Sequence, residues 1–190
     1  MAIKTFTTGE VLTASDTNTY LANSGLVYVG GGSLSSNITN FANCFTSTYD
    51  NYRVVVGNLD NSSTTTTSLS LRLSNAGTTV DSGYEWWTMY WYASGTGSEG
   101  NASATAWQLN YYSDGSPAGA VAFDICSPKK TEYTTGMGSS MAYQSGAGGY
   151  VFRQTGGVLK NSTAYDGFSL LVGNGTMSGT VSIYGYRKGN

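Results

Sequence analysis

Hydrophobic residues alternate with polar ones along most of the chain from Leu26 onward. The clearest case is Leu69, Leu71 and Leu73, which Ser70 and Arg72 separate. An alternation with period two places every second side chain on one face, so this segment is predicted to be a half-buried β-strand. Further alternating sets follow the same rule: Tyr52, Val54, Val56; Trp107, Leu109, Tyr111; Val121, Phe123, Ile125; Met141, Tyr143; Tyr150, Phe152; Phe168, Leu170, Val172; Val181, Ile183.

Segments rich in Gly, Ser, Thr and Asn separate these sets, among them SGTGSEGNAS (94–103), SDGSPAG (113–119) and QTGG (154–157). Such segments are typical of turns. The chain is therefore predicted to contain about nine or ten short strands at hairpin spacing. A parallel sheet would need crossover helices, which the pattern does not provide. The predicted fold is all-β, an antiparallel β-sandwich of jelly-roll type formed by residues 26–190.

Residues 1–25 have a different pattern and are predicted to form a separate N-terminal arm. Thr13 and Asp16 have the spacing of a capping box, with Asp in place of Glu, and predict a two-turn helix over 14–22. A helix so short is marginal alone, so it must dock on the domain, a sister chain or a larger assembly. The apolar residues available for attachment are Ile3, Phe6, Val11, Leu12, Tyr20 and Leu21.

Charge is sparse and excludes several partners. Only 11% of the residues are charged and the net charge is −2, with the basic residues scattered rather than in a stripe. Nucleic acid is therefore not expected as a partner. No apolar run approaches the roughly 20 residues that span a bilayer, and no secretory signal is expected at the start. Cys44 and Cys126 are expected to be reduced, half-buried thiols.

Catalytic and metal-binding residues are not expected. The chain has no histidine, which excludes Ser-His-Asp triads and the usual zinc sites. A carboxylate pair remains conceivable, and Glu85 beside two Trp residues is its best member, among the candidates Asp81, Glu85, Asp114, Asp124, Glu132 and Asp166. Asn58, Asp60 and Asn61 could offer oxygen ligands to calcium, although an Asx turn is the favoured interpretation. We expect no enzymatic activity, no metal and no cofactor.

The densest aromatic stretch is YEWWTMYWY, residues 84–92. In a strand its two faces are both large and mostly apolar. The face of Trp87, Met89 and Trp91 is the more apolar and is predicted to be the core. The other face is predicted to form an oligomer interface or to line a ligand groove, because Tyr buries well with its hydroxyl satisfied; its residues are Tyr84, Trp86, Tyr90 and Tyr92. Burial of both faces within one chain and a carbohydrate-stacking platform are the alternatives.

The N-terminal segment resembles the start of bacteriophage virion proteins, especially tail-fibre and appendage proteins. The matching residues are Phe6, Thr7, Gly9, Glu10, Val11, Leu12, Thr13, Ala14, Asp16, Asn18, Thr19, Tyr20 and Leu21. The resemblance implies a structural component of the virion, typically a homotrimer, whose arm attaches to other particle proteins while the β domain faces outward. The chain lacks a long repetitive stalk. This favours a short tail appendage that contacts host-surface saccharide, with a capsid decoration protein as the alternative.

A saccharide contact, if present, is predicted at two loops that would flank the Trp107 strand, SGTGSEGNAS (94–103) and YYSDGSPAG (111–119). Tyr rings would stack on sugar faces, and Asp and Asn would bond the hydroxyls. The predicted contact residues are Asn101, Tyr111, Tyr112 and Asp114. The alternative is that these loops are only solvated turns.

Overall fold

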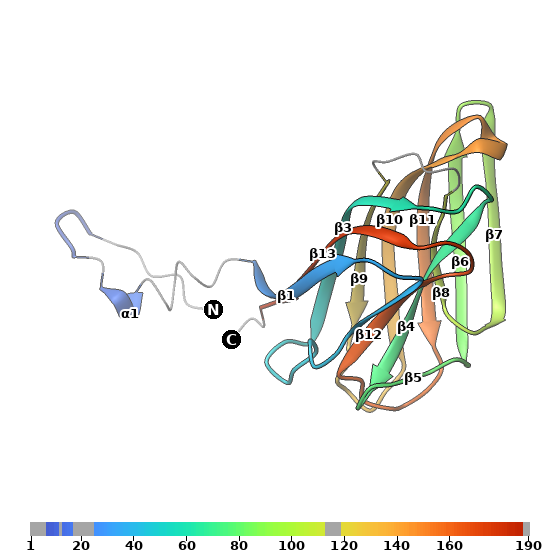
Figure 1. The fold of residues 1–190 in the computed structure, drawn as a ribbon. Helices are drawn as coiled ribbons and strands as arrows, with labels where there is room; N and C mark the ends of the chain where they lie inside the picture. Colours follow the sequence, from blue (N-terminus) through green and yellow to red (C-terminus); the bar gives the residue numbers. More distant parts are fainter. Residues whose placement is uncertain (1–6, 12, 17–24, 113–118, 188–190) are drawn as a thin grey trace.

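The computed structural model describes residues 7–11, 13–16, 25–112 and 119–187. Nearly all the regular structure in this part of the chain is β-strand, arranged in two antiparallel sheets (Figure 1). The short helical segments are α1 (Ala14–Asp16) and the 3₁₀ turn η2 (Ser145–Ala147). The all-β, antiparallel part of the sequence prediction is confirmed.

The larger sheet has eight strands, and every neighbouring pair is antiparallel. In spatial order these are β1 (Leu26–Leu34), β13 (Met177–Tyr186), β3 (Asn51–Asn61), β9 (Gly119–Cys126), β10 (Thr134–Gln144), β11 (Gly149–Leu159), β6 (Tyr84–Tyr92) and β7 (Gly95–Ala104). Strand β7 is therefore at one edge of the sheet. The path of the chain crosses between the sheets several times, so strands far apart in sequence lie side by side.

The smaller sheet contains β2 (Ile38–Phe41), β12 (Gly167–Val172), β4 (Thr67–Asn75) and β5 (Thr78–Thr79), in that order. Strand β8 (Trp107–Tyr112) also pairs with β4. Beyond β8 and β5 this sheet has no further described strands. The larger sheet therefore extends past it on the side of β6 and β7.

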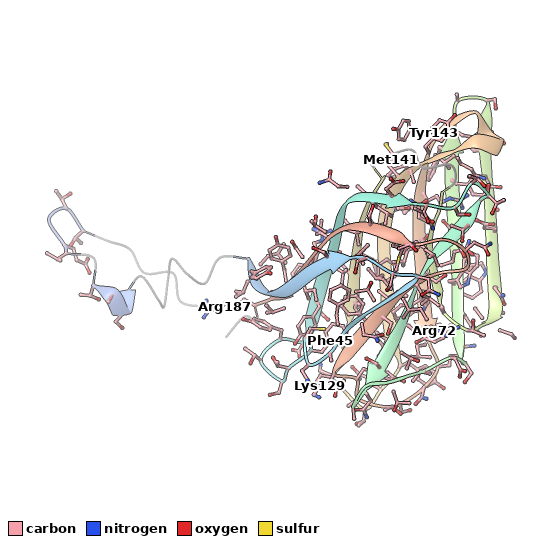
Figure 2. The ribbon with its side chains drawn as sticks, viewed as in Figure 1. Phe45, Arg72, Lys129, Met141, Tyr143 and Arg187 are labelled. Carbon is pink, nitrogen blue, oxygen red and sulfur yellow. The ribbon has the colours of Figure 1, made fainter. Side chains whose placement is uncertain are left out.

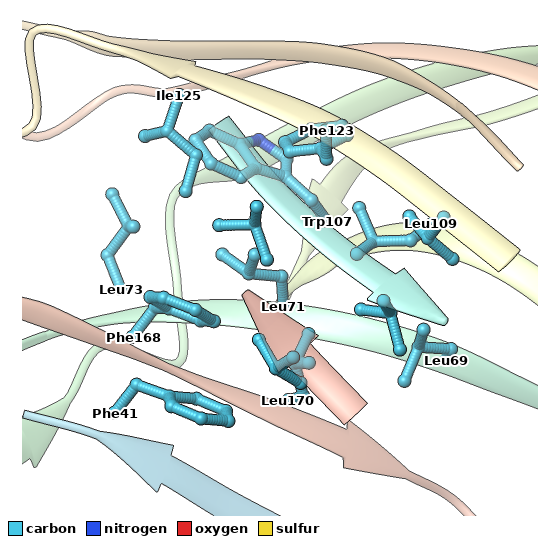
Figure 3. Packing of buried hydrophobic residues seen from close by; sticks show 14 of the residues in the cluster. Phe41, Leu69, Leu71, Leu73, Trp107, Leu109, Phe123, Ile125, Phe168 and Leu170 are labelled. Carbon is cyan, nitrogen blue, oxygen red and sulfur yellow. The ribbon is translucent and has the colours of Figure 1, made fainter. Parts of the chain in front are cut away.

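One hydrophobic cluster joins the two sheets (Figure 3). Its members are the residues that the alternation selected. Leu69, Leu71 and Leu73 of β4 are completely buried, and they face Phe123 and Ile125 of β9 across the core. Burial of a Leu, Ile or Phe side chain stabilises a fold by roughly 1.5–3 kcal/mol. The period-two prediction is confirmed for these strands.

Trp107 of β8 shows why glycine occurs inside several strands. Its ring is fully buried and lies 5.7 Å from the ring of Phe123, centroid to centroid. A Cβ atom at Gly157 of β11 would lie 2.7 Å from Trp107 Cδ1, which is closer than real contacts allow. The prediction that QTGG (154–157) is a turn is therefore wrong. These residues lie within β11, where a side chain at Gly157 would leave no room for the indole.

Little of the N-terminal arm falls within the described residues. All side chains described between residues 7 and 16 are exposed, and Val11 is 79% exposed. Thr7 and Glu10 close a turn, because Glu10 N donates to Thr7 O and Thr7 N donates to Glu10 Oε2, at 3.0 and 3.1 Å. Helix α1 covers Ala14–Asp16 in the described part of the chain. Residues 17–24 lie outside that part, so the predicted two-turn helix over 14–22 stays a prediction. Five of the six apolar residues predicted for attachment also lie outside it: Ile3, Phe6, Leu12, Tyr20 and Leu21.

Across the described ranges, we find no helix with the length and apolar character needed to cross a membrane.

Candidate functional site

The two faces of strand β6 are oriented opposite to the prediction. Tyr84 is completely buried and Trp86 is 7% exposed, and both belong to the core that the sheets share. Trp87 and Met89 are instead 54% and 57% exposed. The assignment of Trp87, Met89 and Trp91 to the core is wrong. So is the assignment of Tyr84 and Trp86 to an oligomer interface, because neither side chain is accessible to a partner.

The reason for the reversal is the environment of the Tyr84 hydroxyl. Its oxygen accepts a hydrogen bond of 2.7 Å from Leu73 N, within the buried core. The ring packs edge-on against Trp107, with centroids 5.5 Å apart. A buried hydroxyl with a partner costs little, so the more polar face is the one that turns inward. Burial also raises the pKa of Tyr84 above its ordinary value.

The other face of β6 belongs to an exposed apolar surface on the side of the larger sheet that points away from the core. Trp91 pairs with Phe152 of β11, and Phe152 pairs with Met141 of β10, so the three side chains form a row across three strands. The rings of Trp91 and Phe152 are 5.5 Å apart. We call this surface the outer aromatic face; it consists of Trp87, Met89, Trp91, Phe152, Met137 and Met141, which are 36–59% exposed.

A second pair of rings extends this face along β10 and β11. Tyr143 and Tyr150 pack edge-on with centroids 5.7 Å apart. Figure 2 shows Met141 and Tyr143 at the end of the molecule opposite to Phe45 and Lys129. The apolar surface therefore reaches the end of the sheet at which β10 meets η2.

Beside the outer aromatic face lies a shallow valley of about 320 Å³, whose lining residues include Ala122, Gly138, Ser139 and Gly156. Arg53 and Asp124 also line the valley and are joined by an ion pair of 3.1 Å. Tyr186 Oη donates to Asp124 Oδ1 at 2.7 Å. Burial, with this bond and the nearby Asp124 charge, raises the pKa of Tyr186 to about 12. The outer aromatic face thus borders a valley that is lined by small residues, by the Arg53–Asp124 ion pair and by Met137 of the face itself.

On the opposite side of the same strands, where the larger sheet extends past the smaller one, lies a cleft of about 320 Å³. We call it the inner cleft. Its main residues are Tyr90, Tyr92, Glu99, Gln144 and Arg153, and Thr66, Gly146 and Ala147 complete the lining. The structure therefore places two of the four predicted interface residues, Tyr90 and Tyr92, beside a hollow.

Arg153 is the centre of the inner cleft and is only 4% exposed. Its Nη1 donates to Glu99 Oε1 in an ion pair, and its Nη2 donates to Gln144 Oε1 at 3.4 Å. The guanidinium carbon lies 4.6 Å from the ring centroid of Tyr90. Glu99 Oε1 also accepts from Gln108 Nε2 of the smaller sheet, at 3.4 Å. The charged groups are thus held by β6, β7, β8, β10 and β11 together.

The residues predicted to contact saccharide are only partly described. Asn101 is exposed, and its Oδ1 accepts a hydrogen bond of 2.8 Å from Ser103 N. It lies on strand β7, so the prediction that residues 94–103 form a loop is wrong. Tyr111 and Tyr112 belong to β8 and pair with Ser68 and Thr67, but their side chains, and the whole of Asp114, lie outside the described residues.

Glu99, Gln144 and Arg153 were not singled out by the sequence, and no local motif marks them. They are brought together by strand register alone. Arg153 is paired with Tyr90, and Thr88, two residues before Tyr90, is paired with Glu99. Only the correct pairing register of β7, β6 and β11 would have predicted this cluster.

Three of the six candidate catalytic carboxylates are engaged in other contacts, and Asp114 lies outside the described residues. Glu85 forms an ion pair with Lys160 Nζ, and Asp124 is held by Arg53 and Tyr186. Asp166 Oδ2 accepts from Ala76 N at 3.0 Å.

The proposed calcium ligands lie at the end of β3, where Asn61 Oδ1 accepts from Ser63 N at 2.8 Å. This bond confirms an Asx turn at Asn61. Among the described residues, no three His, Cys, Asp or Glu side chains gather in a way that could hold a metal.

Both cysteines are free thiols and partly buried, as expected. Cys44 Sγ donates to Phe41 O at 3.4 Å. Burial raises its pKa from the ordinary value of 9.0 to about 12, and burial also raises the pKa of Cys126. Both groups are therefore neutral at physiological pH.

No protein-family model matches the sequence, and no curated protein matches it. One solved structure with some similarity is the CBM2 module of the evolved Dit of Lactobacillus casei BL23 phage J-1. It is 11% identical, with 80% of this chain and 70% of that chain covered, at a TM-score of 0.27. A TM-score so low does not establish a shared fold.

Proposed function

We propose that the chain is a non-enzymatic structural protein of a bacteriophage particle, a short tail appendage. In this proposal residues 1–25 attach it to other virion proteins. The β domain, a sandwich of jelly-roll type, faces outward as part of a homotrimer and contacts saccharide on the host surface.

The resemblance of residues 6–21 to the start of phage tail-fibre and appendage proteins supports the virion location. The exposure of Val11 and of the other described side chains between residues 7 and 16 is consistent with an arm that binds elsewhere. Attachment would bury these side chains against another protein of the particle.

The observation that carries the proposal is the outer aromatic face. Soluble monomeric proteins rarely leave a contiguous apolar patch of large side chains exposed, and such patches mark association surfaces. Aromatic residues and Met are enriched at interfaces, whereas Lys, Glu and Asp are depleted there. Trp87, Met89, Trp91 and Phe152 match this composition. We therefore assign subunit association to this face of β6, instead of the Tyr84 face.

The ridge of large side chains lies directly beside the valley that includes Ala122, Gly138 and Gly156. The ridge of one copy would fill the valley of another copy, and closed symmetric assemblies are the usual result of such contacts. The number three comes from the resemblance to phage appendage proteins, which are typically homotrimers.

Two features support the absence of enzymatic activity. The chain has no histidine, so no imidazole is available as a general base. Glu85, the best catalytic candidate in the sequence, is paired with Lys160. This ion pair already engages the Glu85 carboxylate.

The alternative is a capsid decoration protein. A β domain over residues 26–190 that shows no internal repeat suits a protein that lies on the head surface. The arm and the outer aromatic face would then serve contacts with capsid subunits and with neighbouring copies.

The experiment that tests the proposal compares two binding partners of the full chain. Fluorescently labelled protein is incubated with envelope fragments from the host, and separately with purified phage heads that lack it. Binding to the envelope, competed by free host saccharide, is the expected result. Binding to heads without binding to the envelope would overturn the appendage proposal in favour of decoration.

A further inference from the structure

We propose that the inner cleft is a binding site for an uncharged saccharide, with Tyr92 as the stacking surface and with Glu99 and Gln144 as the groups that bond the sugar hydroxyls. This inference deepens the proposed contact with host saccharide and rests on it. It moves the site from the predicted loops to the exposed end of β6, β7, β10 and β11.

The polar side chains at the floor of the inner cleft are held rigidly. Arg153 is almost completely buried, and its guanidinium bonds Glu99 and Gln144 while it lies against Tyr90. Charged hydrogen bonds of this kind are roughly twice as strong as neutral ones. The carboxylate and the amide are therefore held in place before a ligand arrives, which reduces the entropy lost on binding.

These side chains still have hydrogen-bonding atoms available for a ligand in the cleft. Glu99 bonds through Oε1, and Gln144 also through Oε1. Within the described part of the chain, Glu99 Oε2 and Gln144 Nε2 take part in no hydrogen bond. One is an acceptor and the other a donor. Neighbouring hydroxyl groups of a sugar both donate and accept, so they match this pair.

The two tyrosine rings of the cleft, Tyr90 and Tyr92, differ in their surroundings. Tyr90 lies against Arg153 on one side, and a Cβ at its cross-strand partner Gly97 would come within 2.5 Å of the ring. Tyr90 is thus a fixed wall of the cleft. Tyr92 lies 6.1 Å further along the strand in a nearly parallel orientation and is partly exposed. Its ring offers an apolar surface with a hydroxyl at the rim, suited to the C–H face of a pyranose.

Charge and size select the class of ligand. Arg153 and Glu99 line the cleft as an ion pair, so the guanidinium already has a carboxylate partner and an uncharged ligand is expected. Its volume of about 320 Å³ lies at the small end of the range for ligand pockets, roughly 300–1,000 Å³. A single uncharged sugar ring, at the end or side of a longer chain, fits these limits. Affinity per site is expected on the order of millimolar and rises when several subunits bind one surface.

The test is a titration of the ¹⁵N-labelled full chain, followed by two-dimensional NMR. The probes are glucose, galactose and N-acetylglucosamine, with inorganic phosphate and N-acetylneuraminic acid as charged comparisons. Shifts in the amide signals of β6, β7 and the segment around η2, with at least one neutral sugar, are the expected result. Absence of shifts with all three neutral sugars, or shifts with the charged probes only, would overturn the inference.

Two variants locate the site. Tyr92→Ala is expected to weaken binding of the same sugar by about tenfold or more. Tyr133→Ala is the matched control, because Tyr133 is an exposed tyrosine outside both the inner cleft and the outer aromatic face, and it should leave sugar affinity unchanged. Tyr92 is partly exposed, so the variant should fold, which circular dichroism verifies. Unchanged affinity in folded Tyr92→Ala would overturn the assignment to this cleft.

Failure of this inference and failure of the proposed function are distinguishable. A chain that is absent from phage particles but binds sugar through Tyr92 would refute the virion role alone. A chain that is present on tails and binds host envelope, with no effect of Tyr92→Ala on either measurement, would refute the inner cleft alone.

Discussion

The indole of Trp87 on β6 lies across Gly100, its partner on β7. A Cβ atom at Gly100 would be 2.4 Å from Trp87 Cδ1 and 2.9 Å from the carbonyl oxygen of Trp86. The same relationship recurs three residue pairs away, between Tyr90 and Gly97. Glycines on an edge strand therefore make room for the rings of the neighbouring strand, a known way of stabilising glycine in a sheet. This explains why a segment with the composition of a loop forms β7.

Gly100→Ala should destabilise the fold. The added methyl group meets both a ring and the backbone, so the indole must move, at a cost of about 1–3 kcal/mol. Chemical denaturation measures the free energy of unfolding, and the tryptophan fluorescence of the folded protein should shift. Gly30→Ala is the control, because nothing lies within 4 Å of a Cβ at Gly30. Equal stability of the two variants would contradict the packing argument.

Tyr84→Phe should be destabilising even though it changes one atom. The Tyr84 oxygen is the acceptor for Leu73 N at 2.7 Å within the core. Its removal leaves a buried N–H group without that partner, at a cost of about 1–3 kcal/mol. Tyr133→Phe is the matched control, since Tyr133 is 56% exposed. Thermal unfolding of the two variants should separate them clearly, and similar melting temperatures would argue against this role of the hydroxyl.

Stability should fall as the pH rises from 9 toward 12. Burial raises the pKa of Cys44 from 9.0 to about 12, so the unfolded chain loses this proton first. The folded state then binds more protons than the unfolded state, and the free energy of unfolding decreases with pH. The contribution is fully present below pH 9 and is lost as the pH approaches 12. The slope from this thiol is about 1.4 kcal/mol per pH unit within the window.

The buried tyrosines Tyr84 and Tyr165, whose pKa values are also raised, add to the decrease. Denaturation curves at pH 8, 9, 10 and 11 measure the slope, and Cys44→Ala should make it shallower. An identical slope in wild type and in this variant would show that the Cys44 thiol does not contribute.

Met89→Asp should break the association of subunits. Met89 is 57% exposed on the outer aromatic face, between Trp87 and Trp91 along β6, and a carboxylate there would be desolvated without a partner. Sedimentation velocity is expected to give the mass of three 20.0 kDa chains for the wild type and one chain for the variant. Tyr133→Asp adds the same charge at an equally exposed position outside this face and should remain assembled. A wild-type protein that is monomeric at micromolar concentration would refute the role of the outer aromatic face in subunit association.

The sequence predicted the strands whose buried residues alternate, because a period of two depends only on backbone geometry. Leu69, Leu71 and Leu73 show this directly. It did not predict which face of β6 is buried, since that choice depends on the bond between Tyr84 and Leu73, from another sheet. Ranking the two faces by apolarity alone gave the opposite answer.

The inner cleft could not be predicted because its members are distant in the chain. Glu99, Gln144 and Arg153 meet through the pairing of β6, β7, β10 and β11, and strand order does not follow from alternation. The strands β7 and β11 were also interrupted in the sequence by glycines. These residues signal turns in general, and here they provide room for Trp87, Tyr90 and Trp107.

The most direct test of the virion role is the number of copies of this chain in purified phage particles. Quantitative mass spectrometry of whole particles, separated tails and separated heads supplies this number. It should be compared between the full chain and a chain that lacks residues 1–24, which retains the Gly25 carbonyl that accepts from Arg187 N. The account predicts a small number of copies in the tail fraction, and none for the shortened chain although its β domain melts at the same temperature. Many copies in the head fraction, or no copies in any fraction, would contradict it.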